Sequence, residues 1–411
     1  MTVPNATADS VYERPARPSR WGAWLLGGLL AAFAAVWAWQ QRRVGEGLIV
    51  YTSHDLVFAQ PLLEEWSQVS GVPVAIVGDT EASKSLGLVR RLLAEAEAPQ
   101  ADLFWNNELL GTLELAAAGV LAEHRGSGWA DRPSALRDAD GRWTGLAGRL
   151  RVTVSRPDLE VYDLDFPAPN AAPPDGDATI VIADPMFGTT LTHAALLWDR
   201  LGRDRFASWF DAARASPRVR FVPGNGPACE QVARGAADAA WTDTDDAFTL
   251  RDRYRREGGP PFRIDAWRMP ESWRREGEPP RAVVMIPNTA ALIAKPEIDP
   301  RARDLLEWLL SPEVERRLAA SGSRQIPLGR AAAAALADDE TGEVEEAWML
   351  SQLAGEAIYL RGLLPARNDV LEFLAARAAG KADPAAPTGD SPVLPMDGAA
   401  GDRPARAEPQ S

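Results

Sequence analysis

Acidic and polar side chains follow two apolar segments that lie far apart in the sequence. His54 and Asp55 come after the segment 48–53, and the acidic run 243–246 comes after the segment 238–241. Imidazole and carboxylate groups bind metal cations, whereas backbone amides at helix N-termini hold anions. Strand carboxyl ends and helix N-termini converge in open α/β sheets, so each set suits half of a binding site. The sequence therefore predicts a ligand cleft between two lobes.

The acidic run consists of Asp243, Thr244, Asp245 and Asp246, with three carboxylates in four positions. Asp243 or Thr244 could do no more than cap a helix that begins near Asp245. Capping does not need a second and a third carboxylate, and packed carboxylates repel one another unless a cation or a hydrogen-bond donor neutralises them. We therefore assign all four residues to the ligand site.

Three further positions carry candidate ligand groups, each with a structural alternative. His54 could be a bystander beside a helix cap formed by its neighbours. Glu81 could be a first-turn glutamate that the helix dipole favours. Asn106 and Asn107 follow a strand that ends at Trp105, and they could cap the next helix.

Alternating apolar runs and amphipathic stretches are expected to position these groups. The first half predicts strands at 48–53, 72–77 and 101–105, with helices at 58–69, 83–98 and 108–118. A similar unit follows, with strands at 179–183, 219–222 and 238–241. Such βαβ alternation predicts parallel strands with right-handed crossovers.

The same pattern suggests how the domains are arranged. We expect residues 46–150 and 288–378 to form the first lobe with the C-terminal helices, and 151–287 to form the second. The chain would cross between lobes near 151–154 and 283–293, without one sheet running through both halves. Residues 381–411 are rich in Pro, Ala, Gly and Asp, which is typical of a disordered tail.

The N-terminal part carries a membrane signal. Residues 21–39 are uncharged and span roughly 28 Å as a helix, close to the ~30 Å apolar core of a bilayer. Tryptophans lie near both ends of this run, where indoles favour the interface. The run predicts an uncleaved transmembrane anchor, with 1–20 as a cytoplasmic tail and the folded part outside the cytoplasmic membrane. A cleaved signal peptide is the alternative.

Composition excludes several classes of function. The formal net charge of −14 argues against a nucleic-acid partner. Cys229 is the only cysteine, so neither an intrachain disulfide nor a zinc site with several cysteines can form. The chain lacks G-x-S-x-G, H-E-x-x-H and Walker motifs, so we expect no catalytic residue and no enzyme. We expect a monomer.

Several phrases of the sequence, in their order and spacing, resemble a known family. They are LIVYTSHD, DTEASKSLGLVRRLLAE, QADLFWNNE, DPMFGTTLTHAA, WTDTDDAF, IPNTAALI, LLEWLLSPEVERRLA and QIPL, which together span 48–328. They resemble the ferric-iron-binding group of periplasmic solute-binding proteins of ABC importers. This resemblance implies a two-lobed type II binding-protein fold, hinge strands that close on ligand, and an ABC permease as partner.

The resemblance also implies a ligand set. His54 and Glu81 match metal ligands of the family, whereas no tyrosine pair occupies Thr244 and Asp245, so Asp245 becomes the third candidate metal ligand. The anion positions match Gly188, Thr189, Thr190 and Asn225.

The expected solute is iron(III) or another metal with an accompanying anion, and no other cofactor. An organic phosphonate, a phosphate ester or a polyamine is the alternative solute. A membrane-tethered sensor is the remaining alternative function.

Overall fold

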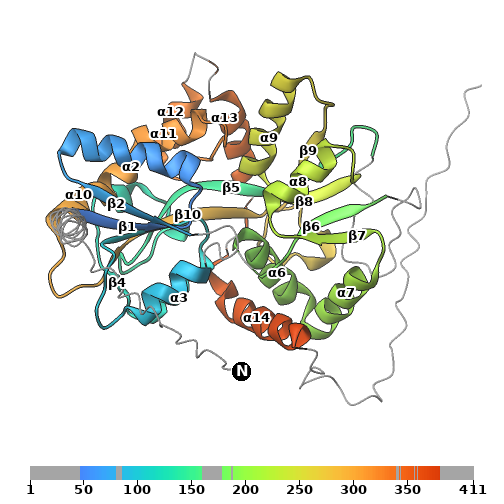
Figure 1. Ribbon diagram of the computed structural model, residues 1–411, viewed down its shortest axis with the longest axis horizontal. Helices are drawn as coiled ribbons and strands as arrows, with labels where there is room; N and C mark the ends of the chain where they lie inside the picture. Colours follow the sequence, from blue (N-terminus) through green and yellow to red (C-terminus); the bar gives the residue numbers. More distant parts are fainter. Residues whose placement is uncertain are drawn as a thin grey trace, which may run out of the picture.

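The chain folds into two α/β lobes joined by two long strands (Figure 1). The computed structural model describes residues 47–79, 86–159, 178–186, 188–338, 342, 344–355, 357–358 and 360–379. Glu81, the apolar run 21–39 and the tail 381–411 lie outside the described residues. Within the described part, no helix combines the length and the apolar character needed to cross a membrane.

The first lobe is built on three parallel strands with β1 in the middle. They are β1 (Leu48–Thr52), β2 (Val74–Gly78) and β3 (Leu103–Asn106). The helices are α2 (Leu56–Ser70), α3 (Leu86–Ala94) and α4 (Leu110–Ala117), and the short elements β4 (Leu121–Ala122), α5 (Ser127–Asp131) and η1 (Ser134–Leu136) follow. The strand–helix alternation predicted here is confirmed.

The second lobe repeats this arrangement, with β6 between two parallel partners. Its strands are β6 (Ile180–Ala183), β7 (Val219–Val222), β8 (Ala239–Asp243) and β9 (Arg263–Ala266). Its helices are α6 (Gly188–Leu201), α7 (Arg203–Ala215), α8 (Asn225–Ala233) and α9 (Thr244–Glu257), followed by the short η3 (Glu271–Trp273). Figure 1 shows the two lobes side by side, with β5 and β10 between them.

Two long antiparallel strands connect the lobes: β5 (Thr144–Ser155) and β10 (Met285–Ile293). The first part of β5, up to Leu150, pairs with β10, and the part from Arg151 onward pairs with β8 and β9. Every residue of both strands is buried. The change of partner lies between Leu150 and Arg151, next to the stretch 151–154 where the sequence predicts a crossing, and the lobe boundaries themselves stay a prediction.

Strand pairing runs without interruption from one lobe to the other, in the order β2-β1-β3-β10-β5-β8-β6-β7. The expectation that no sheet would run through both halves is therefore wrong. The reason is the length of β5, whose twelve residues are enough to pair with both lobes in turn. The hinge is thus part of the sheet rather than a separate linker.

A buried carboxylate braces β5 near this hinge. Ala147 has a φ of 52°, an unusual left-handed conformation for a residue with a Cβ. Glu315 accepts hydrogen bonds from the backbone amides of Ala147, Leu328 and Gly329, each at 2.9 Å, and pairs with Arg132 at 3.2 Å. Both charged side chains are fully buried. This cluster holds β5 against the segment 328–329.

The C-terminal part is helical. It comprises α10 (Pro300–Leu309), α11 (Pro312–Ala320), α12 (Arg330–Ala337), α13 (Glu345–Ala354), η4 (Arg361–Leu363) and α14 (Leu364–Ala378). Helix α14 contacts α4 of the first lobe and α6 of the second. Its Phe373 ring lies 5.6–5.8 Å from the rings of Trp198, Phe206 and Phe210. The C-terminal helix thus bridges the lobes, and the assignment of all of 288–378 to the first lobe stays a prediction.

Glu307 on α10 ties this helix to α5. Its carboxylate bonds His124 Nε2 at 2.7 Å and also accepts from the Ser127 hydroxyl and the Gly128 amide. Partial burial by itself raises the pKa of Glu307. The hydrogen bonds from His124, Ser127 and Gly128 outweigh that effect and lower the pKa to about 2. The ionised carboxylate therefore stabilises the folded state.

We expect Glu307→Gln to lower the free energy of unfolding by about 1–2 kcal/mol at pH 7, with the exposed quarter of the side chain reducing the effect. Because the folded pKa is depressed, this stabilisation is complete above pH 4.5 and disappears as the pH falls toward 2. Urea unfolding of both proteins between pH 7 and pH 2.5 measures it. Asp304→Asn, on the exposed face of the same helix, is the control. A pH-independent difference would contradict this assignment.

Candidate functional site

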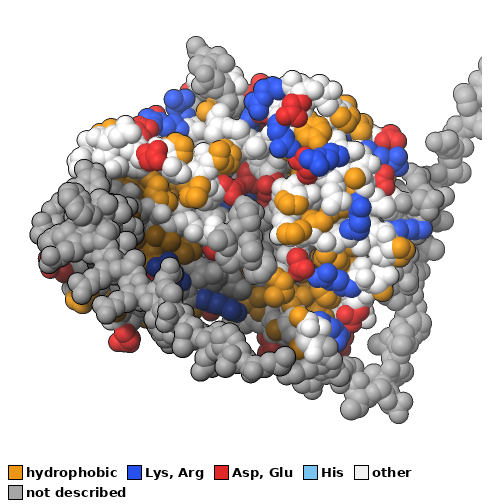
Figure 2. Space-filling model, in the orientation of Figure 1, with side chains coloured by type: hydrophobic (Ala, Val, Ile, Leu, Met, Phe, Trp, Pro, Cys, Tyr) orange, Lys and Arg blue, Asp and Glu red, His pale blue; other side chains and the backbone are white. Residues whose placement is uncertain are grey.

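A cleft of about 840 Å³ lies between the lobes, where the N-terminal ends of α2, α6, α8 and α9 meet. Backbone amides at helix N-termini favour negative charge. The charged side chains that line the cleft are nevertheless mostly acidic: Asp55, Arg149, Asp184, Glu230, Arg234, Asp243, Asp245, Asp246 and Arg253. Figure 2 shows acidic side chains gathered in this hollow between the lobes. The cleft combines groups for a cation with groups for an anion.

The acidic run lies at the start of α9, against the cleft. Asp243, Asp245 and Asp246 each offer a carboxylate oxygen, and these atoms all lie within 4.8 Å of one another. Asp243 and Asp245 are buried, whereas Asp246 is half-buried. Closely spaced carboxylate oxygens are typical ligands of hard cations.

Two buried arginines of β5 partly neutralise the run. Arg149 Nη1 donates to Asp245 at 2.7 Å, and Arg151 Nη1 donates to Asp243 at 2.7 Å. Side chains two positions apart share one face of a strand, so β5 brings both guanidinium groups to the carboxylates. Neither arginine is among the residues predicted for the site. Their signal was the i, i+2 spacing of two charges within an otherwise uncharged hinge strand.

Asp243 organises the anion-type groups beside it. It accepts hydrogen bonds from the Thr189 hydroxyl and, at 2.9 Å, from Asn225 Nδ2. Asn225 Oδ1 in turn accepts from Thr190 at 3.0 Å and from Arg151 at 3.2 Å. Asp243 therefore holds the starts of α6 and α8 together, which leaves it fewer lone pairs for a metal than its neighbours have.

The surroundings of Asp245 raise the pKa of its carboxyl group. Burial raises the pKa of Asp245, the pairing with Arg149 lowers it, and the nearby carboxylates of Asp243 and Asp55 raise it again, to about 6. Its ionised form is therefore costly without a positive neighbour. An added cation would relieve the repulsion among these carboxylates.

The structure brings together most of the residues predicted for the site. Gly188, Thr189, Thr190, Asn225 and the three aspartates line the cleft, and so does Asn107. The Thr244 hydroxyl instead accepts a hydrogen bond from the Leu150 amide, and Thr244 is fully buried.

Two further predicted residues also lie away from the cleft wall. Asn106 is fully buried and bonds the side chains of Ser53 and Thr112. His54 is 2% exposed, packs on the Trp105 ring and bonds Gln325. Glu81 lies outside the described residues.

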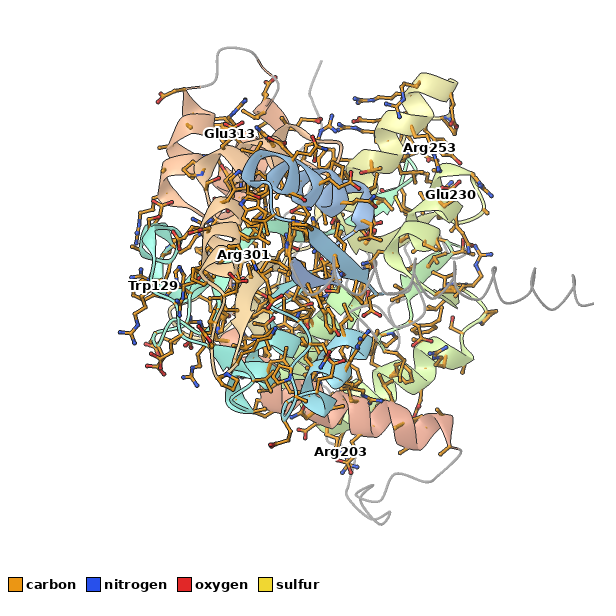
Figure 3. The ribbon with its side chains drawn as sticks, turned by 60° about the vertical axis from the view of Figure 1, so that its left-hand side comes forward. Trp129, Arg203, Glu230, Arg253, Arg301 and Glu313 are labelled. Atoms are coloured by element: carbon orange, nitrogen blue, oxygen red, sulfur yellow. The ribbon has the colours of Figure 1, made fainter. Side chains whose placement is uncertain are left out.

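An ion-pair group stands at the outer rim of the cleft. Glu230 of α8 pairs with Arg253 of α9 and with Arg234, and the two helices present Glu230 and Arg253 next to each other (Figure 3). This group holds one carboxylate and two guanidinium groups, so the negative charge of the cleft comes from its remaining acidic side chains.

Comparison with known proteins identifies structures with a similar fold. No family model matches the chain, and no curated protein matches its sequence. Iron-bound HitA from Pseudomonas aeruginosa is 19% identical over 69% of this chain and 87% of that protein, with a TM-score of 0.57. Apo ferric ion-binding protein A from Pasteurella haemolytica is 15% identical over 80% and 97%, with a TM-score of 0.62.

A third similar structure is the periplasmic binding protein AfuA from Actinobacillus pleuropneumoniae with fructose-6-phosphate bound. It is 15% identical over 80% of this chain and 97% of that protein, with a TM-score of 0.60. The chain thus has the two-lobed fold of periplasmic binding proteins. At 15–19% identity these likenesses establish the fold alone.

Proposed function

We propose that this protein is the extracytoplasmic solute-binding component of an ABC importer, and that its solute is a metal cation, iron(III) first, bound together with an anion. The observation that carries the proposal is the set of three carboxylate oxygens within 4.8 Å at the floor of the interlobe cleft. The anion would lie at the adjoining helix N-termini, which Thr189 and Asn225 join.

The ligand atoms at the cleft floor limit which metals can bind there. Of the described tyrosines, Tyr51 bonds Glu95, and burial together with that neighbour raises its pKa to about 12, while Tyr254 bonds Glu230 at 3.3 Å. The ligands offered at the floor are therefore the carboxylates of Asp245 and Asp246, which suit several hard cations besides iron(III). A bound cation would compete with Arg149 for Asp245, and the released guanidinium could then hold the accompanying anion.

A phosphate ester is the second candidate solute, and two observations favour it. Arg149 lines the cleft, and the fully buried Arg151 bonds the lining residues Asn225 and Asp243 from behind; guanidinium groups form paired hydrogen bonds with phosphate. A cleft of about 840 Å³ is also large enough for a sugar phosphate. AfuA, with fructose-6-phosphate bound, has the same fold.

Calorimetric titration separates the two solutes. Iron(III), supplied as its citrate complex, and fructose-6-phosphate would each be titrated into the wild-type protein and into Arg151→Met. A metal-binding protein takes up iron(III), and Arg151→Met weakens that uptake by tenfold or less, whereas a phosphate-ester binder takes up the sugar phosphate and loses it in Arg151→Met. Binding of neither class would contradict a solute-binding role for this cleft.

The N-terminal apolar run completes the proposal. We propose that residues 21–39 tether the binding domain to the outer face of the cytoplasmic membrane, next to the permease. Protease treatment of spheroplasts should then remove the folded domain, and a domain that resists the protease in intact spheroplasts but not in lysed ones would contradict this topology.

A further inference from the structure

We infer that His54 is a positioning residue for the cleft and not a ligand of the metal. Five buried side chains form a hydrogen-bonded series, here called the polar relay: His54, Gln325, Asn288, Arg149 and Asp245. The relay joins a residue behind the cleft wall to the carboxylate at its floor. The effect of the relay on ligand binding rests on the proposed function. The direction of its hydrogen bonds does not depend on that function.

The contacts of the relay are short and shielded from water. Arg149 bonds Asp245 through Nη1 at 2.7 Å, and its Nη2 donates to the Asn288 side chain and, at 2.7 Å, to the Asn107 carbonyl. Asn288 Nδ2 donates to Gln325 Oε1 at 2.9 Å. Gln325 Nε2 lies 3.1 Å from His54 Nε2. Each relay residue is at most 3% exposed.

Arg149 fixes the direction of every bond in the relay. A guanidinium can only donate, so Asn288 must accept with its oxygen and donate with its amide nitrogen. Gln325 therefore accepts from Asn288 and donates from Nε2. The last bond then needs a lone pair on His54 Nε2, which places the imidazole proton on Nδ1. A metal at Nε2 would have to displace the Gln325 amide.

The hinge strands place the middle of the relay. Pro287 pairs with Gly148 and Thr289 with Gly145, so β5 carries one extra residue opposite Asn288, and the bulge lies at Leu146 and Ala147. Bulges re-aim a side chain, and here the Asn288 amide meets Arg149 of β5 on one side and Gln325 on the other. The relay thus orients Arg149 from the hinge, and a movement of the lobes would act on the Arg149 side chain.

A second buried histidine supplies an internal comparison. Arg151 Nε donates to His193 Nδ1 at 3.4 Å, so the proton of His193 lies on Nε2. Burial, together with the neighbouring Arg151, lowers the pKa of His193 well below its ordinary value, and the ring is neutral. His54 and His193 should therefore be opposite tautomers in the same protein.

Nitrogen-15 NMR of the full-length protein without added ligand tests the relay directly. The chain has only three histidines, and His124→Gln and His193→Gln assign their signals. We expect a protonated Nδ1 and an unprotonated Nε2 for His54, and the reverse for His193. The Gln325→Leu variant should shift the Nε2 signal of His54 alone. A proton on His54 Nε2 would overturn the relay, whatever the cleft binds.

Gallium(III), a redox-inert stand-in for iron(III), tests the consequence for binding. Glutamine at position 54 can accept from Gln325 in place of Nε2 but is a poor metal ligand. We therefore expect His54→Gln to bind gallium(III) within about threefold of wild type, and His54→Leu and Gln325→Leu to weaken binding about tenfold each. If His54→Gln loses as much affinity as His54→Leu while Gln325→Leu loses none, His54 is a ligand. If wild type binds no gallium(III), the proposed metal function fails and the tautomers alone decide the relay.

Discussion

Replacing Asp245 by alanine is expected to weaken the binding of iron(III) at least about 100-fold. Asp245 offers a buried carboxylate within 4.8 Å of two others, so its loss removes both a ligand and a third of the local negative charge. It also leaves the Arg149 guanidinium buried and unpaired, which places a positive charge where the cation would bind. Calorimetry with iron(III) citrate measures the change.

Two further variants make this result interpretable. Asp245→Asn keeps an oxygen for Arg149 but removes the charge, and it should lose nearly as much affinity as Asp245→Ala. Glu257→Ala removes a carboxylate from the exposed C-terminal end of the same helix and should bind like wild type. Equal affinity of Asp245→Ala and Glu257→Ala would place the cation elsewhere.

Glu315→Ala is expected to cost about 3–5 kcal/mol of unfolding free energy, which is the largest stability effect that we predict. The substitution removes the acceptor of three backbone amides and leaves the fully buried Arg132 without its carboxylate. It would also release the unusual conformation at Ala147. Guanidinium unfolding followed by circular dichroism measures the loss.

Glu313→Ala is the matched control, because Glu313 lies on the same helix with about half of its side chain exposed. Its cost should stay below about 1 kcal/mol. A cost of similar size for the two variants would mean that the buried cluster does not brace β5.

Periodicity and strand ends predicted much of the fold and one wall of the cleft. The segment 238–241 led directly to Asp243 and Asp245, because a strand followed by a helix leaves its polar residues at the sheet edge. Thr189 and Asn225 came instead from the family resemblance, and the structure has both at the starts of helices. These are local features, which a sequence carries in its immediate neighbourhood.

Long-range pairings could not be predicted in this way. The placement of His54 depends on Gln325, which lies 271 positions away and reaches it only when the hinge strands are assembled. Arg149 and Arg151 could not be assigned to the site, because the pattern of a strand does not show which carboxylates its charged residues will pair with. The continuous sheet depended on β5 being long enough to pair with both lobes.

Whether the cleft binds a metal together with an anion can be measured by native mass spectrometry of the protein, equilibrated with iron(III) and phosphate and then freed of excess solute. We expect one iron and one anion per chain in wild type and in Glu257→Ala, and neither in Asp245→Ala. Bare wild-type protein under these conditions, or an iron adduct that persists in Asp245→Ala, would contradict this expectation.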